Sequence, residues 1–388
     1  MPTHHALIES ALHRYNTVFD CLHEVITRER TFALFQQIAD AYAPTLTARH
    51  ARGPVVQQWL SAMQRAGSCS QQIHLDLNFR RTGNVVLSLG QSAAKPVWAM
   101  AHLDMISFLT GPYANGRYPL TPYCEARQTS GRRAALALDF GQNPAGEIVE
   151  SGWLSSTPQG HFFETDNAAL APATRIVYAS QAHWDQASGM VYGTIDNAAG
   201  CTSLLMAAAV LSHFDVEALI VLTDEEEGVV AAGPQAFSRG SARLLQHTPA
   251  DELPDLITVT DQHEDVAEIF DGELDLTRFG QGANFGAFAS GAKGGVTPPR
   301  LLAFQRQLST YLAQHSVSLR ENPGYVSRSD CVSAVMATPN VALLGFPAAY
   351  THFIDTPRCH IDDLVNLAKS LAVYILVAQD AEWRAAYL

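Results

Sequence analysis

Basic residues are scarce in this sequence. Its 388 residues include 25 lysines and arginines against 38 aspartates and glutamates, which gives a formal net charge of −13 at pH 7. No basic stripe is present to neutralise phosphate groups or anionic lipid headgroups, so nucleic acid and anionic membrane surfaces are disfavoured as partners. Charged residues make up 16% of the chain and hydrophobic residues 47%, which is typical of a globular protein and not of a disordered one.

Paired cysteine motifs, long apolar runs and a basic leader are also missing. No apolar run is long enough to span a bilayer, and the first residues lack the basic region and apolar core of a secretory signal, so we expect neither feature. The six cysteines are scattered with no Cys-x-x-Cys pair, which disfavours a cysteine-bound zinc site and favours a cytoplasmic protein with reduced thiols. They are Cys21, Cys69, Cys124, Cys201, Cys331 and Cys359.

The apolar patterns that are present indicate an α/β protein. Residues 4–66 repeat apolar positions at helical spacing, and residues 96–102 form a nearly continuous apolar run of the kind found in central strands. From residue 196 onward, predicted helices and strands alternate. The helices are expected at 198–212, 234–246, 299–315 and 362–379, and the strands at 218–223, 256–260 and 341–345. This alternation predicts a mostly parallel sheet flanked by helices on both faces.

One stretch breaks the α/β pattern. Residues 106–184 carry clusters of turn residues between short apolar runs, which predicts a small β-rich domain inserted into the larger one. We therefore predict a catalytic domain made of residues 1–105 and 185–388, which begins with a helical region over residues 1–66. The glycine-rich stretch 280–297 lacks the strand–loop–helix setting of a phosphate-binding loop, and we expect a flexible loop near the site.

Acidic and histidine side chains follow several of the predicted strands. In a mostly parallel sheet, ligands bind beyond the carboxyl ends of the strands, where these side chains are expected to meet. Carboxylate oxygens and imidazole nitrogens are the ligands of hydrolytic zinc sites. The candidates in chain order are His102 and Asp104, Asp196 in a small-residue turn, Asp224-Glu225-Glu226-Glu227, Asp261, and His352.

Each candidate has a competing interpretation. A run of acids is commonly a solvated turn, but three glutamates after an apolar strand are costly to bury unless a cation is present. With a cation, one glutamate can bind it while its neighbour accepts a proton from the attacking water. His183 and Asp185 form a second His-x-Asp pair, and we favour His102 because a buried strand leads into it. The remaining rivals are His360 for His352, and Asp255 and Asp265 for Asp261.

Taken together, these motifs resemble the co-catalytic dinuclear zinc aminopeptidases, and within them the glutamyl, deblocking and tetrahedral aminopeptidases. The resemblance extends over most of residues 75–380. The segments that carry it are Ala101-His-Leu-Asp-Met-Ile-Ser-Phe108, Asp196-Asn-Ala-Ala-Gly200, Glu225-Glu-Glu-Gly228 and Ser329-Asp330. The segment His352-Phe-Ile-Asp-Thr is more similar to the related bacterial leucyl-type zinc aminopeptidases.

The resemblance implies a zinc-peptidase α/β/α sandwich that binds two Zn²⁺ ions per chain, with Co²⁺ or Mn²⁺ as alternatives. It implies an aminopeptidase acting on peptides, and a homo-oligomer that the inserted domain helps to form. Asp196 would bridge the two ions, and Asp104 would orient His102. The remaining implied roles are His102 and Asp261 as ligands of one ion, Glu226 and His352 as ligands of the other, and Glu225 as the general base.

Two other functions stay open. The same site could serve a zinc-dependent deacylase or carboxypeptidase acting on N-acyl amino acids or peptides. A non-catalytic binding protein could also use this fold, although the presence of every ligand type argues against it.

Overall fold

Eight described strands form the central sheet of the α/β domain, in the order β1-β2-β12-β3-β13-β16-β14-β15. The structure, a computed structural model, describes residues 4–123, 130–228, 238–263, 275–288, 297–322, 329–352 and 355–388. The strands are β1 (His74–Asp76), β2 (Val85–Leu89), β3 (Val97–His102), β12 (Ala218–Thr223), β13 (Leu256–His263), β14 (Ala283–Gly286), β15 (Leu319–Glu321) and β16 (Val341–Pro347). The central strands β12, β3, β13 and β16 are parallel, which confirms the predicted fold class.

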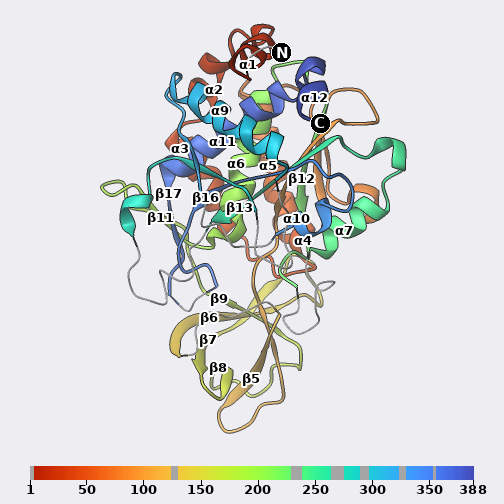
Figure 1. Ribbon diagram of the computed structural model, residues 1–388. Helices are drawn as coiled ribbons and strands as arrows, with labels where there is room; N and C mark the ends of the chain where they lie inside the picture. The colour runs from red at the N-terminus through yellow and green to blue at the C-terminus, as the bar shows by residue number, and fades with distance from the viewer. Residues whose placement is uncertain are drawn as a thin grey trace.

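Helices cover both faces of this sheet (Figure 1). Alternate residues of β3 point to opposite faces, so Ala99 packs into the larger core and Trp98 into a smaller core on the other side. The helices are α1 (His4–His13), α2 (Val18–Val25), α3 (Arg28–Ala39), α4 (Ala48–Ala51), α5 (Gly53–Arg65), α6 (Ile195–Leu211), α7 (Arg239–Gln246), α9 (Pro299–Ala313), α10 (Cys331–Ala334), α11 (Ile361–Val377) and α12 (Ala381–Tyr387). Short 3₁₀ turns lie at Phe79–Arg81, Ala250–Glu252 and Leu276–Arg278.

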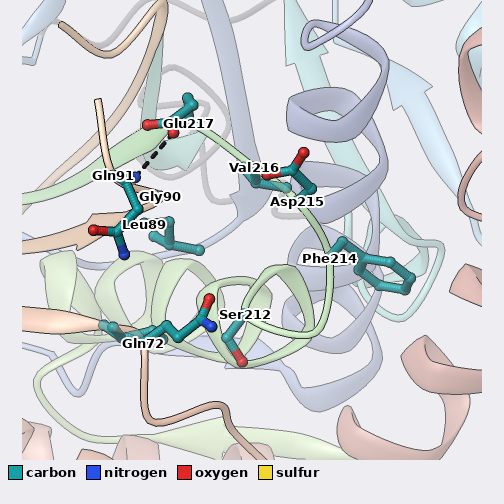
Figure 2. Close-up of a pocket in the computed structure, with 10 residues that line it drawn as sticks. Gln72, Leu89, Gly90, Gln91, Ser212, Phe214, Asp215, Val216 and Glu217 are labelled. Atoms are coloured by element: carbon teal, nitrogen blue, oxygen red, sulfur yellow. Dashed lines mark hydrogen bonds between the residues drawn. The ribbon is translucent and has the colours of Figure 1, made fainter. Parts of the chain in front are cut away.

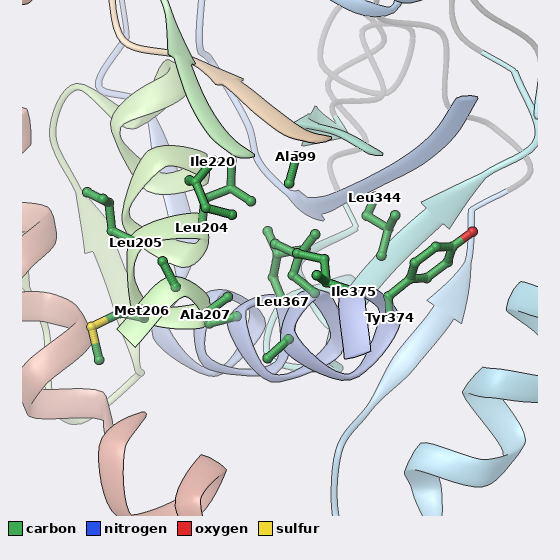
Figure 3. Packing of buried hydrophobic residues seen from close by; sticks show 14 of the residues in the cluster. Ala99, Leu204, Leu205, Met206, Ala207, Ile220, Leu344, Leu367, Tyr374 and Ile375 are labelled. Atoms are coloured by element: carbon green, nitrogen blue, oxygen red, sulfur yellow. The ribbon is translucent and has the colours of Figure 1, made fainter. Parts of the chain in front are cut away.

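Helix α6 is the centre of the larger core. Every one of its residues is buried, because α3, α11 and the sheet enclose it. Its alanines allow α11 to pack closely, and Leu204 and Leu367 lie in the same cluster (Figure 3). Small side chains at a helix contact shorten the distance between helices, so the start of α6 is held firmly against the sheet.

A closed antiparallel barrel lies below the α/β domain in Figure 1. Its own small core includes Phe108, Tyr118 and Phe163. The barrel order is β4-β5-β8-β7-β6-β9, and its strands are β4 (Phe108–Thr110), β5 (Arg117–Pro122), β6 (Gly131–Asp139), β7 (Glu147–Thr157), β8 (Gly160–Glu164) and β9 (Arg175–Tyr178). The chain thus carries the inserted β-rich domain expected from its turn clusters.

The glycine-rich stretch contains one feature that its composition does not predict. Residues 283–286 form β14, which pairs antiparallel with β16 inside the main sheet. Residues 289–296 of this stretch lie outside the described residues. A second small sheet joins β10 (His183–Trp184), β11 (Met190–Tyr192) and β17 (Arg358–His360). Within the described ranges, no helix has the length and apolar character required to cross a membrane.

Candidate metal centre

The carboxyl ends of three central strands meet at one point of the sheet. In the register of β12 and β3, Thr223 lies opposite His102, so the turn that follows β12 starts beside this histidine. Asp261 lies near the end of β13, the other neighbour of β3. The parallel arrangement therefore brings together side chains that are far apart in the sequence.

Asp196 lies between two histidines. Its Oδ1 is 3.0 Å from His102 Nε2, and its Oδ2 is 3.1 Å from His352 Nε2. The residue belongs to the first turn of α6, where Asn197 donates to the carbonyl oxygen of Thr260 and accepts from the amide of Gly200. A Cβ atom at residue 200 would lie 2.1 Å from the Asn197 side chain, so the small residue is required for this turn to form.

Among the described residues, three overlapping groups of side chains place ligand atoms within 4.8 Å of one another. All of their members are buried. The groups are His102 with Asp196 and Asp261, His102 with Glu226 and Glu227, and Asp196 with Glu227 and His352. Four acids therefore face two histidines, and neither carboxylate oxygen of Glu227 has a hydrogen-bond partner. A buried carboxylate without hydrogen bonds is costly unless a cation is bound beside it, so these residues fit a metal ion.

Asp104 connects the two sides of the centre. Its Oδ1 lies 3.5 Å from His102 Nδ1, and its two oxygens accept from the backbone amides of Glu226 and Glu227, each at 3.2 Å. This carboxylate can hold the ring of His102 and the turn after β12 in one arrangement. Partners of this kind orient the ligands of metal sites.

The pKa shifts follow from this crowding of acids. Burial lowers the pKa of His102, but the charge of Glu226 and the hydrogen bonds to Asp104 and Asp196 raise it well above the usual value. Burial raises the pKa of Glu226, and burial with the charge of Asp196 raises that of Asp261 to about 8. Burial also acts on Asp196, but its hydrogen bonds to both histidines hold its pKa far below the usual range. The four carboxyl groups of the cluster can carry more negative charge than the two histidines can neutralise.

Glu225, predicted as the general base, does not join this cluster. Its φ of 60° turns the backbone, and its carboxylate forms an ion pair with Arg243. The structure instead brings in Glu227, to which the family resemblance assigned no role. Aligning the run on Gly228 points to Glu225 and Glu226, and three identical neighbours contain no internal marker that would correct this choice. The other predicted ligands, His102, Asp196, Glu226, Asp261 and His352, do lie together.

The model of peptidase family M28 matches residues 168–362, just over half of the chain. The chain belongs to this family. The matched region contains every residue of the three groups except His102. No curated protein matches the sequence significantly.

Solved aminopeptidases share the fold of this M28 chain at low sequence identity. A TET aminopeptidase from a marine-sediment thaumarchaeon has a TM-score of 0.70 and 14% identity, covering 93% of this chain and 99% of its own. An aminopeptidase from Desulfurococcus kamchatkensis has a TM-score of 0.67 and 15% identity, covering 93% and 98%. The TET1 peptidase of Pyrococcus horikoshii has a TM-score of 0.61 and 15% identity, covering 89% and 98%. The resemblance to tetrahedral and deblocking aminopeptidases is confirmed as a shared fold.

The rival residues of the M28 chain lie elsewhere. His183 is exposed on the β10–β11 hairpin, and Asp185 accepts from the Ser188 hydroxyl and the Ala187 amide in the same hairpin. His360 accepts from the amide of Asp362 at the start of α11 and so acts as its N-cap. Asp185 and His360 therefore already have hydrogen-bond partners away from the cluster. Asp265 lies outside the described residues.

A small cavity of about 80 Å³ lies beside the start of β12 and is unrelated to the cluster (Figure 2). One of its two lining acids, Glu217, accepts from the backbone amide of Gln91 and forms an ion pair with Lys95. The cavity is at the opposite end of β12 from Thr223. None of its lining residues belongs to the three ligand groups.

Proposed function

We propose that this M28 chain is a metal-dependent aminopeptidase with two divalent cations, zinc by default, in the centre around Asp196. The observation that carries the proposal is the pairing of one buried carboxylate with two histidines, one on each oxygen, beside a second carboxylate that has no hydrogen bond. With one histidine beside each of its oxygens, Asp196 would help to hold both cations.

The proposed ligand sets follow from the groups of neighbouring atoms. His102 and Asp261 would hold one cation, Glu227 and His352 the other, and Asp196 both. This assignment moves the role of ligand from Glu226 to Glu227, because Glu227 lies beside His352 Nε2, at 3.5 Å. The role of general base then passes from Glu225 to Glu226.

Glu226 is well placed to move protons. Its Oε2 lies 3.9 Å from His102 Nε2, within the cluster but in neither of the two proposed ligand sets. Two cations, when bound, would lower the pKa of a water molecule and polarise the scissile carbonyl. Glu226 would take the proton of that water and deliver it to the leaving amine. Asp104 would keep Glu226 in position through its backbone amide.

A peptide with a free N-terminus is the substrate class we favour, supported by the shared fold of TET-type aminopeptidases. The runner-up is removal of an acyl group or a C-terminal residue at the same centre. Both reactions break an amide bond with the same groups, so they differ in which end of the substrate is recognised.

The decisive experiment measures metal content per chain and hydrolysis of a leucyl anilide, before and after chelation. We expect about two metals per chain, loss of activity on chelation, and its return with Zn²⁺ or Co²⁺. Hydrolysis of N-acyl amino acids with no hydrolysis of the anilide would move the function to a deacylase. Failure to bind metal from excess zinc would refute the ligand assignment.

We also propose that the barrel, with its surrounding residues 106–184, forms contacts between copies of the chain. Two neighbouring β7 residues, Ile148 and Val149, are 58% and 44% exposed and so offer apolar surface for such a contact. The P. horikoshii TET1 peptidase of similar fold can assemble into a tetrahedron or a large octahedral shell. Replacing both residues with aspartate should reduce the molar mass seen by light scattering without changing metal content. An unchanged mass would exclude this strand from the interface.

A further inference from the structure

Residues 41–52, which we call the N-terminal segment, run along the candidate metal centre although they lie outside the matched region 168–362. The backbone amide of Met105 donates to the carbonyl oxygen of Ala43, and Pro44 forms a β-bridge to the same residue. The segment is therefore joined to the chain directly after the His102–Asp104 strand end. Its polar groups contact Asp104 and Asp224, which follow the strands that lead into the centre.

Thr45 makes the most direct of these contacts. Its hydroxyl lies 2.6 Å from Asp104 Oδ2 and 3.0 Å from the carbonyl oxygen of Glu227. The side chain is buried, with only 1% of its surface exposed. A hydroxyl has a single proton, and the shorter distance directs it to the carboxylate.

Two further contacts fix the segment on either side of Thr45. The carboxylate of Asp224 accepts from the backbone amides of Leu46 and Ala48, at 2.9 and 3.2 Å. The fully buried guanidinium of Arg52 donates to the carbonyl oxygens of Leu103 and Ala41. Thr45 is consequently held in place from both directions, with little freedom to move away from Asp104.

We infer that Thr45 is a positioning residue of the metal centre. By donating to Asp104, it fixes the carboxylate that in turn holds the His102 ring and the amides of Glu226 and Glu227. The two oxygens of Asp104 face four groups, namely the Thr45 hydroxyl, the His102 ring and two backbone amides. The orientation of the carboxylate is therefore set by the donor that is strongest and best fixed in place. The inference rests on the proposed function, and it assigns a role in the centre to the helical N-terminal region.

The test compares three variants by metal titration and by kinetics. Thr45→Val keeps the shape and removes the hydroxyl, and Thr45→Ser restores the hydroxyl. Thr47→Val is the matched control, because the Thr47 hydroxyl donates to the carbonyl oxygen of Pro44 within the same segment. Binding of Zn²⁺ or Co²⁺ to chelator-treated protein is measured first, followed by kcat, KM and Tm.

Thr45→Val should weaken metal binding about 10- to 100-fold and lower kcat about 10-fold at saturating metal, with KM within about threefold. Thr45→Ser should recover metal affinity and kcat to within about threefold of the original protein. Thr47→Val should leave both unchanged while lowering Tm slightly. A purely structural role would lower the Tm of both valine variants and leave the metal affinity of each intact.

Two results would overturn the inference. One is metal affinity and kcat of Thr45→Val equal to those of the original protein. The other is an equal loss in Thr45→Val and Thr45→Ser, since the hydroxyl would then be irrelevant. If the original protein binds two metals but cleaves no peptide, the aminopeptidase proposal fails while the titration still decides the role of Thr45.

Discussion

Two buried acids of this molecule, Asp363 and Glu227, differ in the partners that surround their carboxylates. Asp363 in α11 accepts from the backbone amides of Gly280 and Gly282, at 2.9 and 2.7 Å, one on each oxygen. Glu227 lies as deep, but neither of its oxygens accepts a hydrogen bond. The hydrogen bonds of the Asp363 carboxylate are thus supplied by the backbone of the chain, whereas the Glu227 carboxylate has none.

The comparison separates structural acids from functional ones better than burial or sequence context does. A buried acid with its hydrogen bonds made contributes to one arrangement of the backbone. One without them keeps its lone pairs for a ligand, and histidines on the neighbouring acid favour a divalent cation. Four experiments can break or sharpen this distinction.

The largest effect is expected for Glu226→Gln, compared with Glu225→Gln as its matched control. Removing the general base should lower kcat about 10²- to 10⁴-fold while both metals stay bound. Glu225 already has a partner in Arg243, and its amide replacement should keep kcat within about threefold. Steady-state kinetics with metal analysis tests both variants. The reverse order of effects would return the catalytic role to Glu225.

Chelation should have the next largest effect, a lower Tm, and this effect should depend on Glu227, the buried acid without hydrogen bonds. Metal bound at about 1,000 times its Kd stabilises the folded state by about 4 kcal/mol, so its removal should lower Tm by several degrees. Glu227→Gln should reduce the difference between the chelated and loaded forms. Calorimetry of the four samples gives the result. A Tm that does not change with metal would contradict the proposal that Glu227 is a metal ligand.

The pH dependence of stability should reveal the ionisation of Asp363, the buried acid with hydrogen bonds to both oxygens. Burial raises the pKa of Asp363 to about 7, above its ordinary value near 4. Between about pH 4 and pH 7, Asp363 is ionised in the unfolded chain but keeps its proton in the folded chain. Its contribution to the free energy of unfolding therefore falls as pH rises through this range. The slope is at most about 1.4 kcal/mol per pH unit.

Urea unfolding of the original protein and of Asp363→Asn, at matched metal content, measures this slope. The difference in unfolding free energy between them should change across about pH 4–7 and level off above it. A constant difference would mean that the two backbone amides keep the carboxylate ionised.

The smallest effect is expected at the donors to Asp363. Gly282 has a φ of 110°, and a Cβ there would lie 2.4 Å from the Ser318 side chain. Gly282→Ala should therefore cost about 1–3 kcal/mol in unfolding free energy. Gly116→Ala, with φ of 78° and open space around it, is the control and should cost less. Equal losses would show that steric contact near Asp363 adds nothing to backbone strain.

Much of the fold could be predicted because it depends on local apolar patterns. The continuous run 96–102 became β3, and the helix–strand alternation after residue 196 gave the parallel strands of the sheet. The strand at 283–286 could not be predicted, because its pairing with β16 is a long-range contact and its glycine-rich setting gives no periodic pattern.

The centre was predictable to the level of residue types at strand ends. His102 and Asp196 stand in distinctive local settings, whereas Glu225, Glu226 and Glu227 are identical neighbours. Their separation depends on a backbone turn with positive φ and on Arg243, eighteen residues away. Thr45 carries no motif at all, since its importance arises only when the folded chain brings it to Asp104.

The closed barrel has a consequence for how the chain reaches its native state. His102 and Asp196 are 94 positions apart, and closing so long a flexible loop would carry a substantial entropic cost. Because β4 pairs with β9, with Phe108 opposite Ile176, a folded barrel brings its own two ends together. The intervening residues then behave as a short connection, which lowers the effective contact order of the larger domain. Early folding of the barrel would accelerate assembly of the sheet around it.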